Sequence, residues 1–370
     1  MKKGLLPWNP NLLSEVEELK QKIEGVDNPL RLQQEIFKES LERLTKVVGG
    51  LNKYMASDVN EYQTEHKVIW EEGTTKLLDY GKGDKGAILF VPSLINRSYI
   101  FDISAKRSMV KYLSKAGLHT FLLDWDKPSD VEKDFSISDY IKRLEIAIEK
   151  AAKKSGGKVT LAGYCMGGLM ALAAAISKKD LVGGLVLLAT PWDFNSRDTA
   201  KIPMNEDMKK FLSAMFETGE TVSGQLVYQL LYLSKPWTIH NKYIRFASMD
   251  GESEDAKSFI EREKWLHDGV DLTKKVAKEC FIDWAVDNVT EKGKWEVDGK
   301  VINPSEVACP TMVVIPQFDR IVPRECATAL GMKIKNAQTV FPSCGHIGMV
   351  AGTNAKEHLW LSLEKWVSSL

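Results

Sequence analysis

The stretch that decides the fold is residues 158–170, KVTLAGYCMGGLM. It runs from an apolar, β-branched segment into a glycine-rich turn, and then into a helix-forming run that continues to Ile176. This order predicts a strand, a sharp turn and a helix, with Cys165 at the tip of the turn. A residue held there in a strained backbone conformation needs small neighbours two positions before and two after it. Gly163 and Gly167 meet that need.

Cys165 stands in the position of a nucleophile. A thiol at the start of a helix lies near backbone amides that lower its pKa, so Cys165 is a candidate acyl acceptor. The alternative interpretation is that this turn only packs a helix on a sheet, with Cys165 as a buried apolar filler. The partners found further along the chain favour the catalytic interpretation.

The composition excludes several classes of function. The chain has 370 residues, enough for one large α/β domain or two ordinary ones. Lysine plus arginine equals aspartate plus glutamate, 50 against 50, so no net charge attracts nucleic acid or an anionic membrane. The longest apolar runs are too short to cross a bilayer, and the first ten residues lack the apolar core of a signal peptide. We therefore expect a cytoplasmic protein.

The cysteines and histidines indicate neither a disulfide framework nor a metal site. The five cysteines are an odd number without regular spacing, which fits a reducing compartment. The sequence has no CxxC pair and no HExxH motif, and its six histidines are scattered. We therefore expect no metal and no bound cofactor.

The N-terminal segment, residues 1–60, is predicted to be helical. Apolar residues recur at helical spacing in two stripes within residues 9–55, Leu12 to Ile23 and Phe37 to Val48. Asp27-Asn28-Pro29 should separate the two helices, and Gly49-Gly50 should end the second. Such stripes usually pack against the same protein, and the alternative is a surface for a dimer or another subunit.

The middle and the end of the chain predict a parallel, doubly wound sheet. A hairpin is expected over residues 67–80. Near the end of the chain, a short strand is expected over residues 337–341 and a final helix over residues 354–367. Continuous apolar strands alternate with helices, and the strands are predicted at 87–91, 120–124, 159–162, 184–189 and 311–315. The chemistry of such a sheet lies at the carboxyl ends of its strands. We assign residues 61–193 and 308–370 to this α/β core.

The alternation stops between residues 194 and 307. An insertion of this length between two core strands is too long for a loop, so it must have a core of its own. Its aromatic residues fall mostly at helical spacing. We predict a large, mainly helical cap over the active site, with most aromatics inside the cap and a minority lining an acyl channel.

Two further residues complete a candidate triad with Cys165. Asp319 follows the strand at 311–315, and His346 follows the strand at 337–341. Nucleophile, acid and histidine in that chain order, each just past a core strand, are typical of the α/β-hydrolase fold. His346 would take the proton of Cys165 or pair with its thiolate, and Asp319 would orient the imidazole. Asp193, which follows the strand after the elbow, ranks second for the acid.

The oxyanion would be bound by backbone N–H groups. We expect one donor from Met166 and another from the loop after the strand at 87–91, at Ile95 or Asn96. A thiolate that attacks a thioester exchanges thiols of similar pKa, and the acyl-enzyme stays activated for a later acceptor. A cysteine elbow under a large cap therefore favours acyl transfer from a thioester.

The sequence resembles the polyhydroxyalkanoate synthases from about Val68 to Trp366. The most specific match is residues 91–102, VPSLINRSYIFD, because simple hydrolases lack the Leu-Ile-Asn-Arg-x-Tyr-Ile element. The other matches are residues 122–125 (LLDW), the box around Cys165, 263–265 (EKW), 319–323 (DRIVP) and 345–348 (GHIG).

This resemblance implies polymerisation of (R)-3-hydroxyacyl-coenzyme A, with 3-hydroxybutyryl-coenzyme A as the expected substrate, to a polyester with release of coenzyme A. Cys165 would carry the growing chain, and His346 with Asp319 would activate the thiol and the incoming 3-hydroxyl. The length resembles that of the shorter synthases, which act with an accessory subunit. The resemblance also implies a homodimer located at the surface of polymer granules.

Two departures from the family pattern are Ser343-Cys344 before Gly345-His346, where glycine is usual, and the acidic Asp126 after Trp125. Neither removes a catalytic group. The alternative function is a cysteine hydrolase, of the dienelactone hydrolase type or acting on esters or polyesters, although such enzymes lack so long an insertion. A scaffold on an inactive hydrolase fold is a third reading, which the intact triad disfavours.

Overall fold

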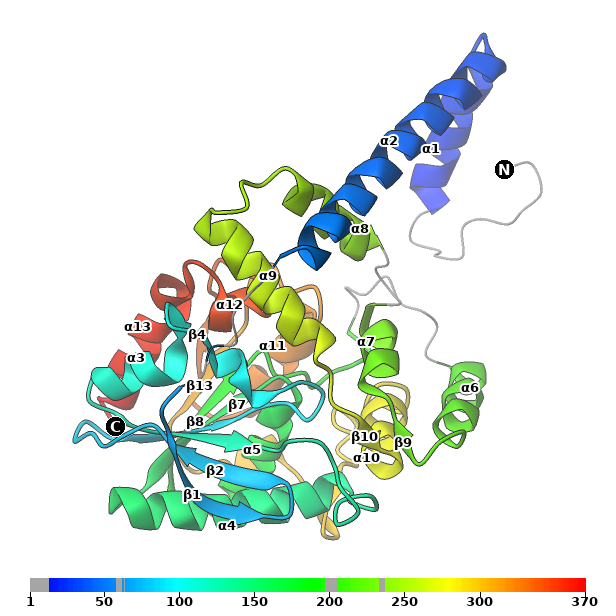
Figure 1. The fold of residues 1–370 in the computed structure, drawn as a ribbon. Coiled ribbons are helices and arrows are strands. Elements are labelled where there is room, and N and C mark those ends of the chain that lie inside the picture. Colours follow the sequence, from blue (N-terminus) through cyan, green and yellow to red (C-terminus); the bar gives the residue numbers. More distant parts are fainter. Residues whose placement is uncertain (1–12, 58–61, 63, 197–204, 233–236) are drawn as a thin grey trace. The chain divides into compact units, whose positions relative to one another are not determined.

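The computed structural model describes residues 13–57, 62, 64–196, 205–232 and 237–370 (Figure 1). The chain divides into two compact units. The first comprises Met1–Val59, Thr199–Pro203 and Leu230–Ile260, and the second comprises Asn60–Asp198, Met204–Gln229 and Glu261–Leu370. The insertion predicted as a cap, residues 194–307, is thus shared between the two units.

The second unit is built on one eight-stranded sheet. Its strands are β1 (Lys67–Glu72), β2 (Thr75–Asp79), β3 (Ala87–Val91), β6 (His119–Asp124), β7 (Val159–Tyr164), β8 (Val182–Leu188), β13 (Thr311–Val314) and β14 (Gln338–Val340). Their order is β1-β2-β6-β3-β7-β8-β13-β14. The pairs β1–β2 and β2–β6 are antiparallel, and the remaining neighbours are parallel. The mostly parallel, doubly wound sheet predicted from the sequence is confirmed.

Helices cover both faces of this sheet (Figure 1). They are α3 (Met109–Lys115), α4 (Ile137–Ser155), α5 (Met166–Ser177), α11 (Arg324–Lys333), α12 (Gly348–Ala351) and α13 (Leu361–Val367), which continues a π-helical turn (Lys356–Trp360). Helix α4 begins where Ser136 and Asp139 cap each other's backbone N–H groups, and it ends at Gly156 with φ +80°. One continuous apolar core joins the sheet to α3, α12 and α13.

The part of the insertion that belongs to the second unit is made of short elements. They are α6 (Glu206–Phe216), β9 (Thr221–Val222), the start of α7 (Gly224–Tyr232), the end of α9 (Glu254–His267), β10 (Leu272–Thr273), α10 (Lys274–Lys278), a π-helical turn (Glu279–Trp284), β11 (Glu296–Val297), β12 (Lys300–Val301) and a 3₁₀ turn (Pro304–Glu306). The loop after β3 adds a 3₁₀ turn (Ser98–Phe101) and the short strands β4 (Asp102–Ser104) and β5 (Arg107–Ser108).

The first unit is helical, as predicted for the N-terminal segment. It contains α1 (Leu13–Glu24), α2 (Pro29–Met55), α8 (Trp237–Ala247) and the start of α9. Its small core is formed by Tyr243, Phe246, Phe259 and Ile260, against which Leu51 of α2 packs. Leu12, the first residue of the predicted stripe, lies outside the described residues.

Helix α2 begins where the sequence predicts and ends later. The side chain of Asn28 accepts a hydrogen bond of 3.0 Å from the N–H of Arg31, as an N-cap does. The expected end at Gly49-Gly50 is wrong, because the helix continues to Met55. A Cβ on Gly50 would lie 2.1 Å from the carbonyl oxygen of Tyr243. This glycine therefore permits a close approach of α2 and α8 instead of ending the helix.

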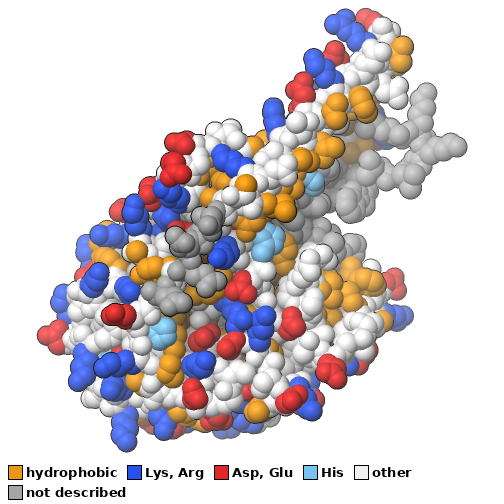
Figure 2. Space-filling model, in the orientation of Figure 1, with side chains coloured by type: hydrophobic (Ala, Val, Ile, Leu, Met, Phe, Trp, Pro, Cys, Tyr) orange, Lys and Arg blue, Asp and Glu red, His pale blue; other side chains and the backbone are white. Residues whose placement is uncertain are grey.

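The second apolar stripe of the N-terminal helices is exposed. Phe37, Leu41, Leu44 and Val48 have exposed fractions of 70%, 54%, 57% and 45%. Figure 2 shows hydrophobic side chains along α2. The expected burial against the same protein is therefore not found for this stripe, and the alternative, a surface for another subunit, stays a prediction. Among the described helices none is long and apolar enough to cross a membrane.

Candidate active site

The turn between β7 and α5 has the strained geometry of a nucleophile elbow. Cys165 adopts φ +54° and ψ −123°, a conformation that residues with a side chain rarely take. A Cβ on Gly163 would lie 2.5 Å from the Cα atom of Gly168, and one on Gly167 would lie 2.3 Å from the carbonyl oxygen of Val91. The predicted strand, turn and helix, and the need for both glycines, are confirmed by this packing.

A third glycine of the elbow was not singled out from the sequence. A Cβ on Gly168 would lie 1.8 Å from the hydroxyl oxygen of Thr190, which is buried beyond the end of β8. The signal for this contact is the doubled glycine after Cys165. Its partner Thr190 follows another strand, β8, so only the packing of the sheet reveals why the second glycine is needed.

His346 and Asp319 meet at the carboxyl ends of β14 and β13. The Nδ1 atom of His346 lies 2.7 Å from Oδ2 of Asp319, and the two side chains are 7% and 1% exposed. The other oxygen of Asp319 accepts the N–H groups of Ile321 and Val322 at 2.8 and 2.9 Å. The carboxylate is thus fixed by its own turn, and it leaves one oxygen for the imidazole.

Cys165 is half-buried and interacts with the same imidazole. Besides Asp319, to which it is hydrogen-bonded, His346 is influenced by Cys165, and both neighbours raise the pKa of the imidazole. Burial by itself would lower the pKa of His346, but the neighbouring charges of Asp319 and of the Cys165 thiolate outweigh it and raise the pKa to about 10. Asp319 is hydrogen-bonded to His346, and Cys165 acts on the pKa of the same imidazole; the triad formed by the three residues stays a prediction.

Asp193, the acid ranked second for the triad, is hydrogen-bonded to other residues. Oδ1 of Asp193 accepts hydrogen bonds from Nδ2 of Asn288 at 2.8 Å and from the N–H of Asn195 at 3.0 Å. Asp124, at the end of β6, accepts the hydroxyl of Ser98 at 2.8 Å. The structure pairs His346 with Asp319, the residue that the sequence ranked first.

The three predicted oxyanion donors differ in how they are engaged. Met166 is the first residue of α5, and in the described part of the chain no acceptor is found for its N–H. The N–H of Ile95 donates to the hydroxyl of Ser93 at 3.2 Å, so this donor is already used. For the N–H of Asn96, as for that of Met166, no acceptor is found among the residues that the structure describes. The N–H groups of Met166 and Asn96 are thus not engaged like that of Ile95, and their role as oxyanion donors stays a prediction.

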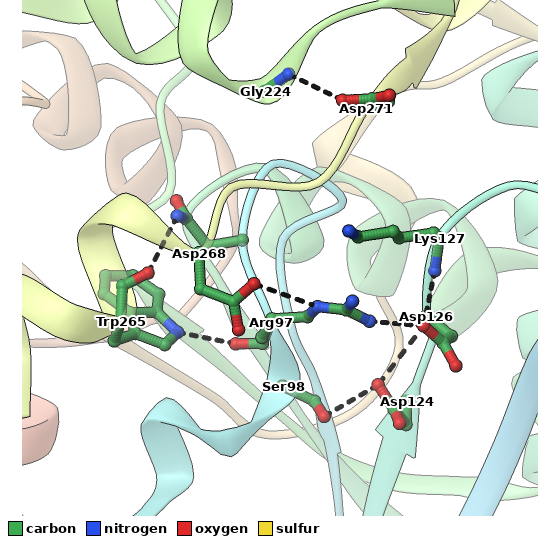
Figure 3. Close-up of polar contacts among 10 residues, drawn as sticks. Arg97, Ser98, Asp124, Asp126, Lys127, Gly224, Trp265, Asp268 and Asp271 are labelled. Carbon is green, nitrogen blue, oxygen red and sulfur yellow. Dashed lines mark hydrogen bonds and ion pairs between the residues drawn. The ribbon is translucent and has the colours of Figure 1, made fainter.

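The loop that carries Asn96 is held against the segment after α9 (Figure 3). The carbonyl of Ile95 accepts the N–H of Val270 at 2.9 Å, and Asn96 pairs with Gly269 in an antiparallel bridge. The indole of Trp265 donates to the carbonyl of Arg97 at 2.7 Å. The sequence places Trp265 in the 263–265 motif and among the aromatic residues of the insertion, but it does not predict this contact.

Two other cysteines near this site are unreactive by environment. Cys280 is buried, and its Sγ lies 3.7 Å from the sulfur of Met166. Burial raises the pKa of Cys280 well above its usual value, and burial raises that of Cys344 to about 12. Neither thiol is therefore a competing nucleophile. Within the described ranges, no three or more histidine, cysteine or acidic side chains are grouped to hold a metal ion.

Comparison with known families agrees with this architecture. A family model described as alpha/beta hydrolase fold matches residues 86–353. The chain therefore belongs to the alpha/beta hydrolase fold family, which confirms the fold class predicted from the sequence.

Within this fold family, the chain is similar to poly(3-hydroxyalkanoate) polymerase subunits. The chain is 26% identical to the poly(3-hydroxyalkanoate) polymerase subunit PhaC of Haloarcula marismortui, over 92% of this chain and 76% of that protein. It is also 26% identical to the PhaC subunit of Allochromatium vinosum, over 90% of this chain and 97% of that protein. The resemblance to polyhydroxyalkanoate synthases stated from residue motifs is confirmed.

Solved structures support the same fold. The monoacylglycerol lipase of Paleococcus ferrophilus aligns with a TM-score of 0.52 at 19% identity, over 83% of this chain and 99% of that chain. A thermophilic esterase from Thermogutta terrifontis aligns with the same score at 18% identity, over 83% and 99%. At this level of identity, the likeness concerns the fold alone.

Proposed function

We propose that this protein is a polyester synthase that polymerises (R)-3-hydroxyacyl-coenzyme A thioesters through an acyl group carried on Cys165. The observation that carries the proposal is the position of Cys165, a thiol at a strained elbow that shares His346 with Asp319. The similarity to PhaC subunits over about nine-tenths of the chain supports the choice of substrate class.

In the first half-reaction, the thiolate of Cys165 attacks the carbonyl carbon of the thioester. The new C–S bond forms a tetrahedral oxyanion, which the N–H groups of Met166 and Asn96 bind. The C–S bond to coenzyme A then breaks, and the proton on His346 goes to the departing thiolate. Asp319 keeps the imidazole oriented and stabilises its positive charge throughout.

In the second half-reaction, a 3-hydroxyl group is the acceptor. His346 takes the hydroxyl proton while the oxygen attacks the thioester carbonyl on Cys165, and an ester bond replaces the C–S bond. Cys165 leaves as a thiolate beside the imidazolium of His346, whose pKa is raised to about 10, and takes up its role as acyl acceptor again. A thiol suits this cycle because exchange between thioesters is nearly balanced, and the acyl group stays activated for transfer.

The proposal extends to partners and place. A homodimer, an accessory synthase subunit and attachment to the polymer granule are expectations from the family resemblance, together with a cytoplasmic location. Coenzyme A enters as part of the substrate, and no separate cofactor is proposed.

Product analysis tests the proposal. Purified protein with 3-hydroxybutyryl-coenzyme A should release coenzyme A and form insoluble polyester, and the assay is run with and without a candidate accessory subunit. Free 3-hydroxybutyrate without polymer would instead favour a cysteine hydrolase. If no thioester is turned over under either condition, the proposal is contradicted and a scaffold on the hydrolase fold is favoured.

A further inference from the structure

The β3 loop, which we define as Pro92–Arg97, is fastened on one side by the end of α9 and by the segment that follows this helix. Val270 donates to Ile95, and the Trp265 indole donates to the carbonyl of Arg97 at 2.7 Å. That segment is itself fixed, because a Cβ on Gly224 would lie 2.6 Å from the carbonyl carbon of Gly269. The N–H of Gly224 also donates to Asp271 at 3.0 Å (Figure 3).

The side chain of Arg97 fastens the same loop in two directions. Its guanidinium forms an ion pair with Asp126, and its Nε lies 3.7 Å from Oδ1 of Asp268 (Figure 3). Asp126 follows the end of β6, whereas Asp268 follows α9. The arginine thus joins the loop after β6, the β3 loop and the segment after α9 through a side chain that is only 21% exposed.

Asp126 is held in place to receive this arginine. It adopts φ +55°, and its carboxylate also accepts the N–H of Lys127 at 2.7 Å. Its own N–H reaches Oδ1 of Asp124 at 3.4 Å, and the same oxygen accepts the hydroxyl of Ser98 at 2.8 Å. A strained residue that is fixed on several sides is a precise anchor for a charged partner.

We propose that Arg97 is a positioning residue, which holds the Asn96 N–H in the place where the oxyanion develops. The inference rests on the proposed function, and it gives a role to the acidic Asp126, which departs from the family pattern. In the described residues, Arg97 contacts none of Cys165, Asp319 and His346, so its effect passes through the loop. Oxyanion donors act only at the right distance, and an error of about 1 Å can cost about 100-fold in rate.

The test separates acyl transfer from thiol reactivity. Arg97→Met should lower the turnover number with 3-hydroxybutyryl-coenzyme A by about 10- to 100-fold at nearly unchanged KM. Alkylation of Cys165 by iodoacetamide needs no oxyanion donor, so its rate should equal that of the unmodified protein. Arg97→Lys keeps one charge and should recover part of the turnover.

Asp268→Asn removes one ion-pair partner of Arg97 and leaves the backbone hydrogen bonds of the segment after α9. Its turnover number should therefore fall less than that of Arg97→Met, again at nearly unchanged KM. Arg324→Met is the matched control, because that guanidinium stacks on the ring of Phe341 at 4.5 Å and, among the residues that the structure describes, contacts neither the β3 loop nor the three triad residues. Its turnover should be unchanged.

Turnover of Arg97→Met equal to that of the unmodified protein would overturn the positioning role alone. Equal losses of turnover and of Cys165 alkylation would also overturn it, since they would indicate general damage to the elbow. Failure of the unmodified protein to react with the thioester is a different result, which removes the proposed function and the positioning role together.

Discussion

The imidazole of His346 and the carboxylate of Asp319 form a hydrogen bond of 2.7 Å across 27 positions of the chain. Both side chains are almost fully buried, and the carboxylate is held by two backbone N–H groups of its own turn. A buried acid that gives one oxygen to the imidazole, and a histidine with a raised pKa, define the electrostatics of this site. The predictions below follow from this pair and from the packing around it.

Asp319→Asn should weaken both activity and the pH dependence of stability. The pKa of His346 is about 10 in the folded protein, whereas that of an unfolded histidine is about 6.5. The stabilisation is therefore fully present below about pH 6.5 and is lost as the pH rises towards about 10. We expect the decrease in unfolding free energy over this range to be smaller in Asp319→Asn, in urea titrations at several pH values.

The same variant should lose turnover by about 1,000- to 10,000-fold, because the asparagine favours the wrong tautomer of the imidazole. A pH profile of stability identical to that of the unmodified protein would show that Asp319 does not set the protonation of His346.

Glu279 should destabilise the folded protein above neutral pH. Burial raises the pKa of this carboxyl to about 7, while one of its oxygens accepts the N–H of Ile137 at 2.8 Å. A raised carboxyl pKa gives a contribution that is present below the unfolded value near 4.3 and lost as the pH rises through about 7. Glu279→Gln keeps an acceptor for Ile137 and avoids the buried charge.

We therefore expect Glu279→Gln to gain stability relative to the unmodified protein between about pH 5 and about pH 8, by of order 1 kcal/mol. Glu296→Gln, at an exposed position, controls for the substitution itself. The prediction would be contradicted if the difference in unfolding free energy between Glu279→Gln and the unmodified protein stayed constant across this pH range.

Two adjacent glycines of α2 should respond in opposite directions to alanine. Nothing lies within 4 Å of a Cβ on Gly49, so Gly49→Ala should raise stability by about 0.5–1 kcal/mol through helix propensity. A Cβ on Gly50 would meet the backbone of Tyr243 at 2.1 Å, so Gly50→Ala should separate α2 from α8 and lower stability. Thermal unfolding measures the melting temperature of both variants. A change of the same sign and size in the two would contradict this packing.

Cys165→Ala should abolish turnover, whereas Cys309→Ala and Cys280→Ala should change mainly stability. Burial raises the pKa of Cys309 and that of Cys280, so neither supplies a thiolate. Turnover and melting temperature are measured for all three variants. Equal losses of turnover in the three would remove the basis for calling Cys165 the nucleophile.

Much of the core could be predicted because its signals are local. The apolar strands, the elbow at Cys165 and the chain order of Cys165, Asp319 and His346 follow from patterns of a few residues each. The capping residues Asn28 and Ser136 mark helix starts in the same local way.

The remaining features depend on contacts between distant parts of the chain. Lys53 of α2 donates to the carbonyl of Met249, 196 positions later, and this packing places residues 230–260 with the N-terminal helices. The close partner of Gly50, Tyr243, is likewise far away in the sequence. The local pattern around Gly50 therefore predicts a helix end that the structure does not have. Likewise, the bond from Trp265 to Arg97 spans 168 positions, so no local pattern indicates it.

Trapping of the acyl-enzyme tests the central claim most directly. The protein is mixed briefly with 3-hydroxybutyryl-coenzyme A, quenched in acid and mapped by mass spectrometry of its peptides. We predict a hydroxybutyryl adduct on Cys165 that hydroxylamine removes, and no adduct in Cys165→Ala. An adduct on a different residue, or undiminished turnover in Cys165→Ala, would contradict the account.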